Sequence, residues 1–166
     1  MKKIFLLFSL LIWTAAAGAQ DLQKAELFGG FSYSRGFPID LNMYGWNASL
    51  AGVVNRWFSI VGDLSDNYGR FGESYHVSML SVAGGPQFSY RTKTITPFVR
   101  FLIGANRIGA SHANVTNFGV VLGGGFDISV NKRFAIRPLQ ADWMHANVEG
   151  GHLNQGRLSA GVVVKF

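Results

Sequence analysis

Three residues near the end of the chain carry side chains that could do chemistry together: His145, Glu149 and His152. An imidazole and a nearby carboxylate could serve as a general base and the group that orients it. Such a pair also needs a nucleophile within hydrogen-bond reach. Asn147 stands two positions after His145, and the nearest downstream serine is Ser159, deep in the last predicted strand. We therefore predict that the chain is not an enzyme.

Metal and cofactor chemistry has no stronger pattern in this sequence. No pair among His76, His112, His145 and His152 has the helical H-x-x-x-H spacing, and the chain contains no cysteine. The glycine run Gly123-Gly124-Gly125 falls inside a predicted strand, where it is not a phosphate-binding turn. We predict no metal site and no cofactor, and we interpret the histidines as ordinary surface residues.

The first residues have the pattern of an export signal. Lys2 and Lys3 precede an apolar run over residues 4–13, and Ala17-Gly18-Ala19 has the A-x-A form of a cleavage site. The apolar run is only about half of the roughly 20 residues that a membrane helix needs. The sequence therefore predicts a signal peptide over residues 1–19.

The remainder, residues 20–166, has the length of one domain. It carries 13 basic and 9 acidic side chains, a net charge of +4 that does not indicate nucleic-acid binding. Charged residues make up only 14% of the whole chain, against about 25% in soluble domains. No run of 18 apolar residues follows the leader, so we expect no membrane-spanning helix.

Eight segments of period-two alternation organise this domain, and such alternation is typical of β-strands. We predict strands over residues 24–35, 43–54, 57–66, 75–90, 95–107, 116–130, 134–147 and 154–166. The connections alternate between three short ones (residues 55–56, 91–94 and 131–133) and four longer ones (residues 36–42, 67–74, 108–115 and 148–153). Within the fourth strand, Gly84-Gly85-Pro86 indicates a bend or an irregularity in pairing. The pattern predicts an all-β, eight-stranded, antiparallel up-and-down barrel.

The size of the side chains indicates which face points outward. One face of each strand carries large apolar groups such as Phe101, Leu122 and Ile128, whereas the other carries mostly Gly, Ser, Ala and Asn with a few charges. An eight-stranded barrel has an interior only wide enough for side chains to fill. We therefore predict that the bulky face meets lipid and that the barrel crosses a membrane.

The whole domain resembles the barrel domain of OmpA-type and related small bacterial outer-membrane proteins. The similar motifs are Gly84-Gly85-Pro86, Thr96-Pro97-Phe98, Arg137 with Gln140 and Asp142, and the terminal aromatic Phe166. The resemblance implies an outer-membrane location, a periplasmic C-terminus and outward-facing longer loops. It also implies that Phe166 is an assembly signal read by the barrel-assembly machinery. The peptidoglycan-binding domain of larger members has no counterpart in this sequence.

The inward faces gather eight charged side chains, which we predict to neutralise one another. These are Glu26, Asp63, Asp127 and Asp142 with Arg100, Arg137, Arg157 and Lys165. We expect Arg100 to be the hub, with Asp63 or Asp142 as its partner. Strict alternation would place Arg137 and Asp142 on opposite faces, so we predict a β-bulge between them, near Pro138.

These observations predict a structural or adhesive outer-membrane barrel whose interior is plugged by charge. A small passive channel and a lipid A-modifying enzyme are the alternatives. The expected partners are outer-membrane lipid, the assembly machinery and a surface ligand bound through the outer loops. We expect a monomer that binds no nucleic acid.

Overall fold

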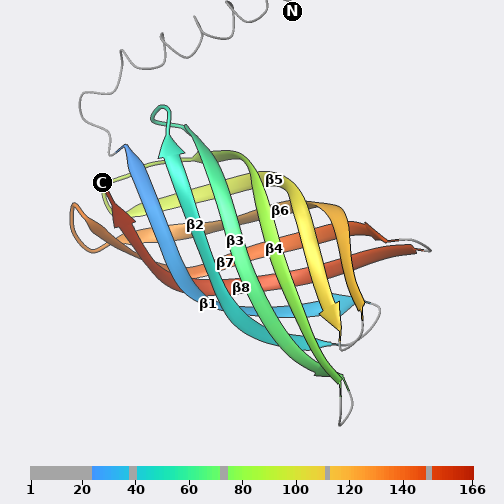
Figure 1. Cartoon of the computed structure of the whole chain (residues 1–166). Helices are drawn as coiled ribbons and strands as arrows, with labels where there is room; N and C mark the ends of the chain where they lie inside the picture. Colours follow the sequence, from blue (N-terminus) through green and yellow to red (C-terminus); the bar gives the residue numbers. More distant parts are fainter. Residues whose placement is uncertain (1–23, 38–40, 72–74, 111–112, 149–150) are drawn as a thin grey trace, which may run out of the picture.

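The computed structural model describes residues 24–37, 41–71, 75–110, 113–148 and 151–166, so the predicted signal peptide lies outside the described residues. Eight β-strands make up nearly all of the described chain (Figure 1). They are β1 (Ala25–Phe37), β2 (Asn42–Val53), β3 (Phe58–Phe71), β4 (Tyr75–Ser89), β5 (Ile95–Ala110), β6 (Ala113–Ser129), β7 (Phe134–Val148) and β8 (Gly151–Lys165). None of the described residues forms a helix long and apolar enough to cross a membrane.

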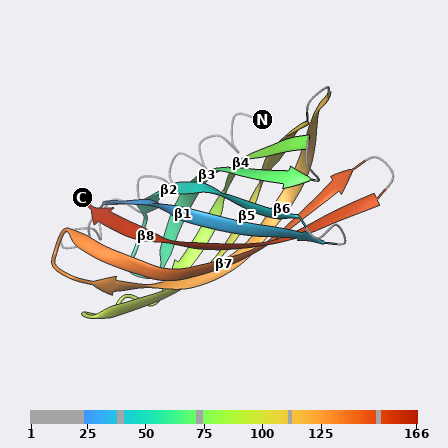
Figure 2. The same ribbon diagram turned by 90° about the horizontal axis from the view of Figure 1, so that it is seen from below.

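Each strand pairs antiparallel with the next, and β1 pairs with β8, so the sheet is a closed barrel without edges. At the seam, the Phe166 amide donates to the Ala25 carbonyl at 2.8 Å. The C-terminus therefore lies beside the start of β1 in both views (Figures 1 and 2). We call this the terminal end of the barrel and the opposite one the far end. The predicted fold class is confirmed.

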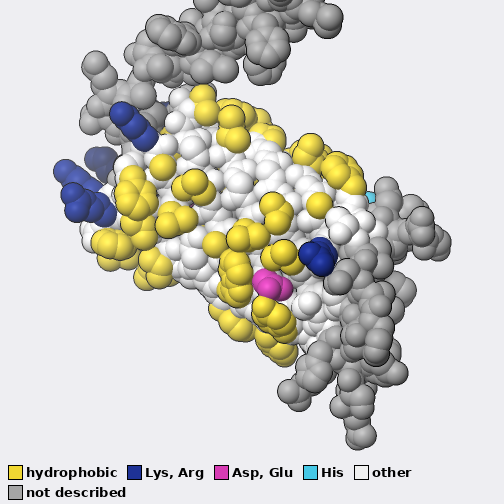
Figure 3. Space-filling model, in the orientation of Figure 1, with side chains coloured by type: hydrophobic (Ala, Val, Ile, Leu, Met, Phe, Trp, Pro, Cys, Tyr) yellow, Lys and Arg dark blue, Asp and Glu magenta, His cyan; other side chains and the backbone are white. Residues whose placement is uncertain are grey.

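The two faces of the wall differ as the alternation predicts. Leu50, Ile60, Phe101 and Leu122 point outward and are each about half exposed. The inward positions are almost all buried and largely polar. Figure 3 shows the apolar side chains spread over the outer wall between the two ends. A wall of this kind avoids water, and a lipid environment satisfies it.

Aromatic side chains gather on the outer wall toward both ends. At the terminal end, the Trp57 and Tyr90 rings lie 5.3 Å apart, and at the far end Tyr33 and Tyr44 lie 5.2 Å apart. Trp and Tyr prefer the membrane–water interface, because one part of each ring system is apolar and the other polar. The two belts therefore mark the two borders of an apolar band.

Asparagine side chains close two of the three turns at the terminal end. The Asn55 amide oxygen accepts from the backbone N–H groups of Trp57 and Phe58, at 2.8 and 2.9 Å. Asn131 makes the same pair of bonds to Arg133 and Phe134. Such Asx turns reverse the chain within about four residues, which agrees with the short connections predicted here.

The prediction of longer connections at the far end is wrong. β3 continues to Phe71, β5 to Ala110 and β8 begins at Gly151, so only two to four residues separate successive strands at this end. The polar residues there resemble a loop in sequence, but they continue the backbone ladder. Strand pairing does not require apolar side chains where the wall emerges from the apolar band.

The predicted bulge is present in β7. Arg137 pairs with Gly161 and Gln140 with Ser159, so two residues of β7, Pro138 and Leu139, lie opposite one residue of β8, Ala160. β6 shows the matching shift between Phe126 and Ile128. The predicted irregularity in β4 is also found: Gly85 and Pro86 have no partners in β5, although the register on either side is unchanged. Proline has no N–H to donate, which explains the gap.

We predict that a charge on the outer wall is tolerated only near its borders. Leu122→Arg, in the middle of β6, should lower the free energy of unfolding in lipid vesicles by about 2–4 kcal/mol. Val130→Arg, at the terminal end, should cost at most about 1 kcal/mol. Denaturant titrations of the two variants measure the difference, and equal losses would contradict the lipid-facing assignment.

Candidate functional site: the charged interior of the barrel

Four charged side chains from different parts of the wall meet inside the barrel. Arg100 on β5, Asp142 on β7 and Arg157 on β8 lie in one row across the sheet, with Gly123 of β6 between the first two. Asp63 reaches them from β3. Each of the four charged residues is at most 4% exposed. We call Asp63, Arg100, Asp142 and Arg157 the central quartet.

Arg100 bridges both aspartates of the central quartet. Its Nε and Nη2 donate to Oδ1 and Oδ2 of Asp142 at 2.9 and 2.8 Å, a bidentate pair. Its Nη1 donates to Oδ2 of Asp63 at 2.9 Å. Both partners that the sequence suggested are therefore present at once, because a planar guanidinium presents donors on two sides.

Arg157 completes a ring by contacting the same two carboxylates. Its Nε donates to Oδ2 of Asp142 at 3.0 Å and its Nη2 to Oδ1 of Asp63 at 2.9 Å. Nη1 donates to the Ser65 hydroxyl at 2.6 Å. Two positive and two negative charges thus neutralise one another through direct ion pairs. Removing one member of a buried ion pair typically costs about 3–5 kcal/mol, because the partner is left charged and unpaired.

Arg137 forms a second layer nearer the terminal end. Its Nε and Nη2 bind the two oxygens of Asp127 at 2.7 and 3.0 Å. Its Cζ lies 4.5 Å from the ring centre of Phe28 and 4.3 Å from that of Phe98. Phe28 and Phe98 are buried in the lumen, where two rings face the guanidinium by cation–π contact. This contact explains why Phe28 stands on the polar face of its strand.

Gln140 joins the two layers. Its Oε1 accepts from Arg137, and its Nε2 donates to Oδ2 of Asp142 at 2.9 Å and to Oδ1 of Asn47 at 3.2 Å. Asn47 in turn donates to Asp63 at 3.0 Å. The bulge in β7 makes this possible, because it changes the alternation so that Arg137, Gln140 and Asp142 all point inward.

Charges at the terminal end of the lumen depart from the predicted set. Glu26 binds Arg91, with Nη2 and Oε1 3.3 Å apart, and Arg91 was assigned to a turn by the sequence pattern. Lys165 donates to the Ser129 hydroxyl at 3.1 Å. Arg91 could have been found by continuing the inward series Gln87, Ser89, because the alternation extends two residues beyond the end of β4.

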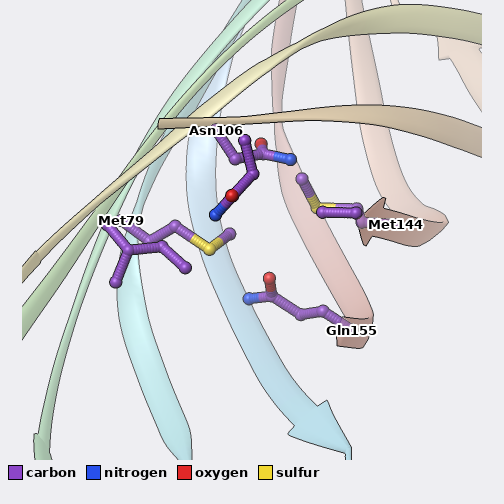
Figure 4. Close-up of a pocket in the computed structure, with 7 residues that line it drawn as sticks. Met79, Asn106, Met144 and Gln155 are labelled. Atoms are coloured by element: carbon purple, nitrogen blue, oxygen red, sulfur yellow. The ribbon is translucent and has the colours of Figure 1, made fainter. Parts of the chain in front are cut away.

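Sequence reasoning missed a layer of methionines in the lumen toward the far end, which we call the methionine layer. All three methionines after residue 1, Met43, Met79 and Met144, are buried there in one apolar cluster. Figure 4 shows Met79 and Met144 beside the carboxamides of Asn106 and Gln155, around a cavity of about 10 Å³. This is roughly the space of one water molecule. No charged side chain lines this cavity.

The candidate catalytic histidine, His145, contacts Asn154 and Trp143. Nδ1 of His145 lies 2.8 Å from Oδ1 of Asn154, and its ring stacks on Trp143 at 5.7 Å. The side chains of His76, His112, Glu149 and His152 lie outside the described residues. Among the side chains that are described, no group of three or more His, Cys, Asp or Glu could hold a metal ion.

Phe166, the predicted assembly signal, lies at the seam of the barrel. Its side chain is 66% exposed on the outer wall, and its backbone pairs with Ala25 in both directions. The last residue therefore closes the ladder between β8 and β1.

Gly123 provides the space for the central quartet. A Cβ at this inward position would lie 1.9 Å from Oδ1 of Asp142. We predict that Gly123→Ala displaces this carboxylate and lowers the free energy of unfolding by about 3–5 kcal/mol. Gly29→Ala is the matched control, because a Cβ there meets nothing within 4 Å. Denaturant unfolding in vesicles compares the two, and similar stabilities would show that the quartet tolerates displacement.

Several solved structures share this fold at low sequence identity. Neisserial surface protein A superposes with a TM-score of 0.69 and 15% identity, over 86% of this chain and 97% of that one. Ail, the attachment invasion locus protein of Yersinia pestis, solved with the heparin analogue sucrose octasulfate, gives 0.63 and 18% over the same shares. The outer-membrane enzyme PagL gives 0.56 and 15%, over 81% of this chain and 97% of that one.

Sequence comparisons are less informative. No family model matches the chain. A 56-residue segment is 43% identical to the ribosomal RNA small subunit methyltransferase H of Allorhizobium ampelinum, which covers 34% of this chain but only 16% of the methyltransferase. The structural likeness extends over most of the chain, and it establishes that the chain has the fold of small eight-stranded outer-membrane β-barrels.

Proposed function

We propose that this chain is an outer-membrane barrel that is closed by its own ion pairs and serves as a structural or surface-interaction protein. The apolar outer wall and the fold it shares with outer-membrane barrels support the location. The central quartet carries the proposal for the interior, because it links β3, β5, β7 and β8 across the lumen.

A passing ion would have to separate these pairs. The side chains of Arg100, Asp142 and Arg157 are 0% exposed, and that of Asp63 is 1% exposed. Eight strands leave little room beside them. The second layer around Arg137 lies on one side of the quartet, and the methionine layer lies on the other. An ion crossing the lumen would therefore meet three successive barriers.

With the C-terminus in the periplasm, as the family resemblance implies, the far end is the surface that faces the external medium. Ail, solved with a heparin analogue, and Neisserial surface protein A share this architecture, which supports a surface role. In this chain, the rim offers the aromatic rings of Tyr33, Tyr44 and Tyr68 and the cation Arg35. A screen of glycan and protein ligands on intact cells tests this role.

We propose a non-enzymatic role, although PagL shares the fold. The carboxamide of Asn154, which pairs with His145, provides neither a nucleophile nor a carboxylate. Mass spectra of lipid A from cells with and without the protein test this statement. A change of one acyl chain would favour the lipid A-modifying alternative.

The assembly role of Phe166 leads to a further prediction. Removing Phe166 should reduce the amount of barrel in the outer membrane severalfold, because the assembly machinery would lose its signal. The same variant refolded directly into vesicles should lose much less stability, since only one residue at the seam is missing. Membrane fractionation and denaturant unfolding measure the two effects, and wild-type levels in the membrane would contradict the signal.

The plugged interior predicts a low conductance that depends on Arg100. In planar bilayers, the unmodified protein should show almost no steady current. Arg100→Ala should lower the free energy of unfolding by about 3–5 kcal/mol and raise the conductance, because Asp63 and Asp142 lose their bridge.

The control is Arg107→Ala, which removes an exposed cation from the outer wall of the same strand. It should leave both stability and current nearly unchanged. Steady channels through the unmodified protein would instead support the passive channel. Asn117 and Gln155 give that alternative a physical basis, because each has a buried side-chain nitrogen without a hydrogen-bond acceptor among the described residues.

A further inference from the structure

The charges of this barrel are divided unevenly along its axis. In the middle of the lumen, Arg100, Arg137 and Arg157 are balanced by Asp63, Asp127 and Asp142. At the terminal end, the described side chains include seven cations and one anion: Lys24, Arg56, Arg91, Lys93, Lys132, Arg133 and Lys165 against Glu26. The far end shows no such excess, since its described charges are Arg35, Arg107 and Asp66. Among the described side chains, positive charge is therefore concentrated at the terminal end.

Most of these terminal-end cations point away from the lumen. Arg91 is held by Glu26, and Lys165 bonds to Ser129 inside the barrel. The other five cations are exposed: Lys24, Arg56, Lys93, Lys132 and Arg133. No described carboxylate side chain is exposed at this end. Figure 3 shows basic side chains gathered at the end where the C-terminus lies. We call these five residues the cationic rim.

The cationic rim lies directly beside the aromatic belt of the same end. Arg56 precedes Trp57, whose ring packs on Tyr90, and Lys93 belongs to the turn that follows Tyr90. Only four or five residues connect the strands here, so the cations cannot extend far beyond the belt. Because Trp and Tyr lie at the level of lipid headgroups, the rim lies at the level of their phosphates.

We propose that the cationic rim binds anionic phospholipid headgroups of the leaflet it faces, with phosphatidylglycerol as the representative ligand. Basic residues at a membrane surface attract anionic lipids, and the attraction of each Lys or Arg falls off within a Debye length. Guanidinium groups such as those of Arg56 and Arg133 suit phosphate oxygens by bidentate hydrogen bonding. A lipid fits this rim better than a soluble polyanion, since the short turns keep the cations against the bilayer.

This proposal rests on the membrane-spanning role proposed above, but it fails separately from it. A barrel that folds in vesicles and shows no lipid preference would remove the rim proposal alone. Native mass spectrometry of the full barrel, extracted from bilayers of equal parts phosphatidylethanolamine and phosphatidylglycerol, counts the lipids retained of each class. We expect phosphatidylglycerol to be retained severalfold over phosphatidylethanolamine.

Two double variants with equal charge loss locate the effect. Arg56→Gln with Lys93→Gln removes two rim cations, whereas Arg35→Gln with Arg107→Gln removes two exposed cations at the far end. Each cation near an anionic surface raises the affinity for anionic lipid about fivefold. The first variant should therefore lose most of the preference for phosphatidylglycerol. The second should keep it. Heat-modified gel mobility confirms that both variants are folded.

Salt provides a readout that does not depend on substitutions. Phosphatidylglycerol retention by the wild-type barrel should fall between about 0.1 and 1 M salt, as the Debye length shrinks from about 10 to 3 Å. Equal retention of the two lipid classes would overturn the proposal, as would equal losses in the two double variants. A preference unaffected by salt would also overturn it.

Discussion

The neutralisation of buried charge inside a narrow barrel is the constraint on which this structure depends. Side chains fill the interior of an eight-stranded barrel, so a charge buried deep in the lumen needs a partner of opposite sign across it. The central quartet meets this demand with two arginines that each contact two aspartates. Neighbouring features follow from it: Gly123 leaves space for a carboxylate, Asn47 adds a second donor to Oδ2 of Asp63, and Ser65 accepts from Nη1 of Arg157.

The bulge in β7 serves the same constraint. An unbroken strand would turn either Arg137 or Asp142 toward lipid, where a charge is costly. One extra residue beside Pro138 brings both inside, and Leu139 and Pro138 take the outward positions. Backbone irregularity therefore costs less here than a misplaced charge. Proline suits the position because the ladder is already interrupted there.

Alternation in the sequence predicted the eight strands, their faces and this bulge, because side-chain direction has a strict period of two. It could not predict which residues meet across the lumen. That depends on the register of strands far apart in sequence, as Asp63 and Arg157 illustrate. Nor did it predict the far end, where the polar ends of β3 and β8 look like loops, or the inward position of Arg91, two residues beyond the end of β4. The methionine layer has no alternation signal of its own, since methionine fills gaps in any core.

The layers of the interior explain why the quartet can be both buried and strong. Phe28 and Phe98 lie on the terminal side of it, and Met43, Met79 and Met144 on the far side. Apolar groups at both ends keep the local dielectric low, which strengthens each ion pair once it is formed and raises the cost of breaking it. The same burial would penalise any unmatched charge, so the balance within the lumen is strict. The outer rims face no such penalty, and that difference allows the excess positive charge to collect at the terminal end without destabilising the barrel.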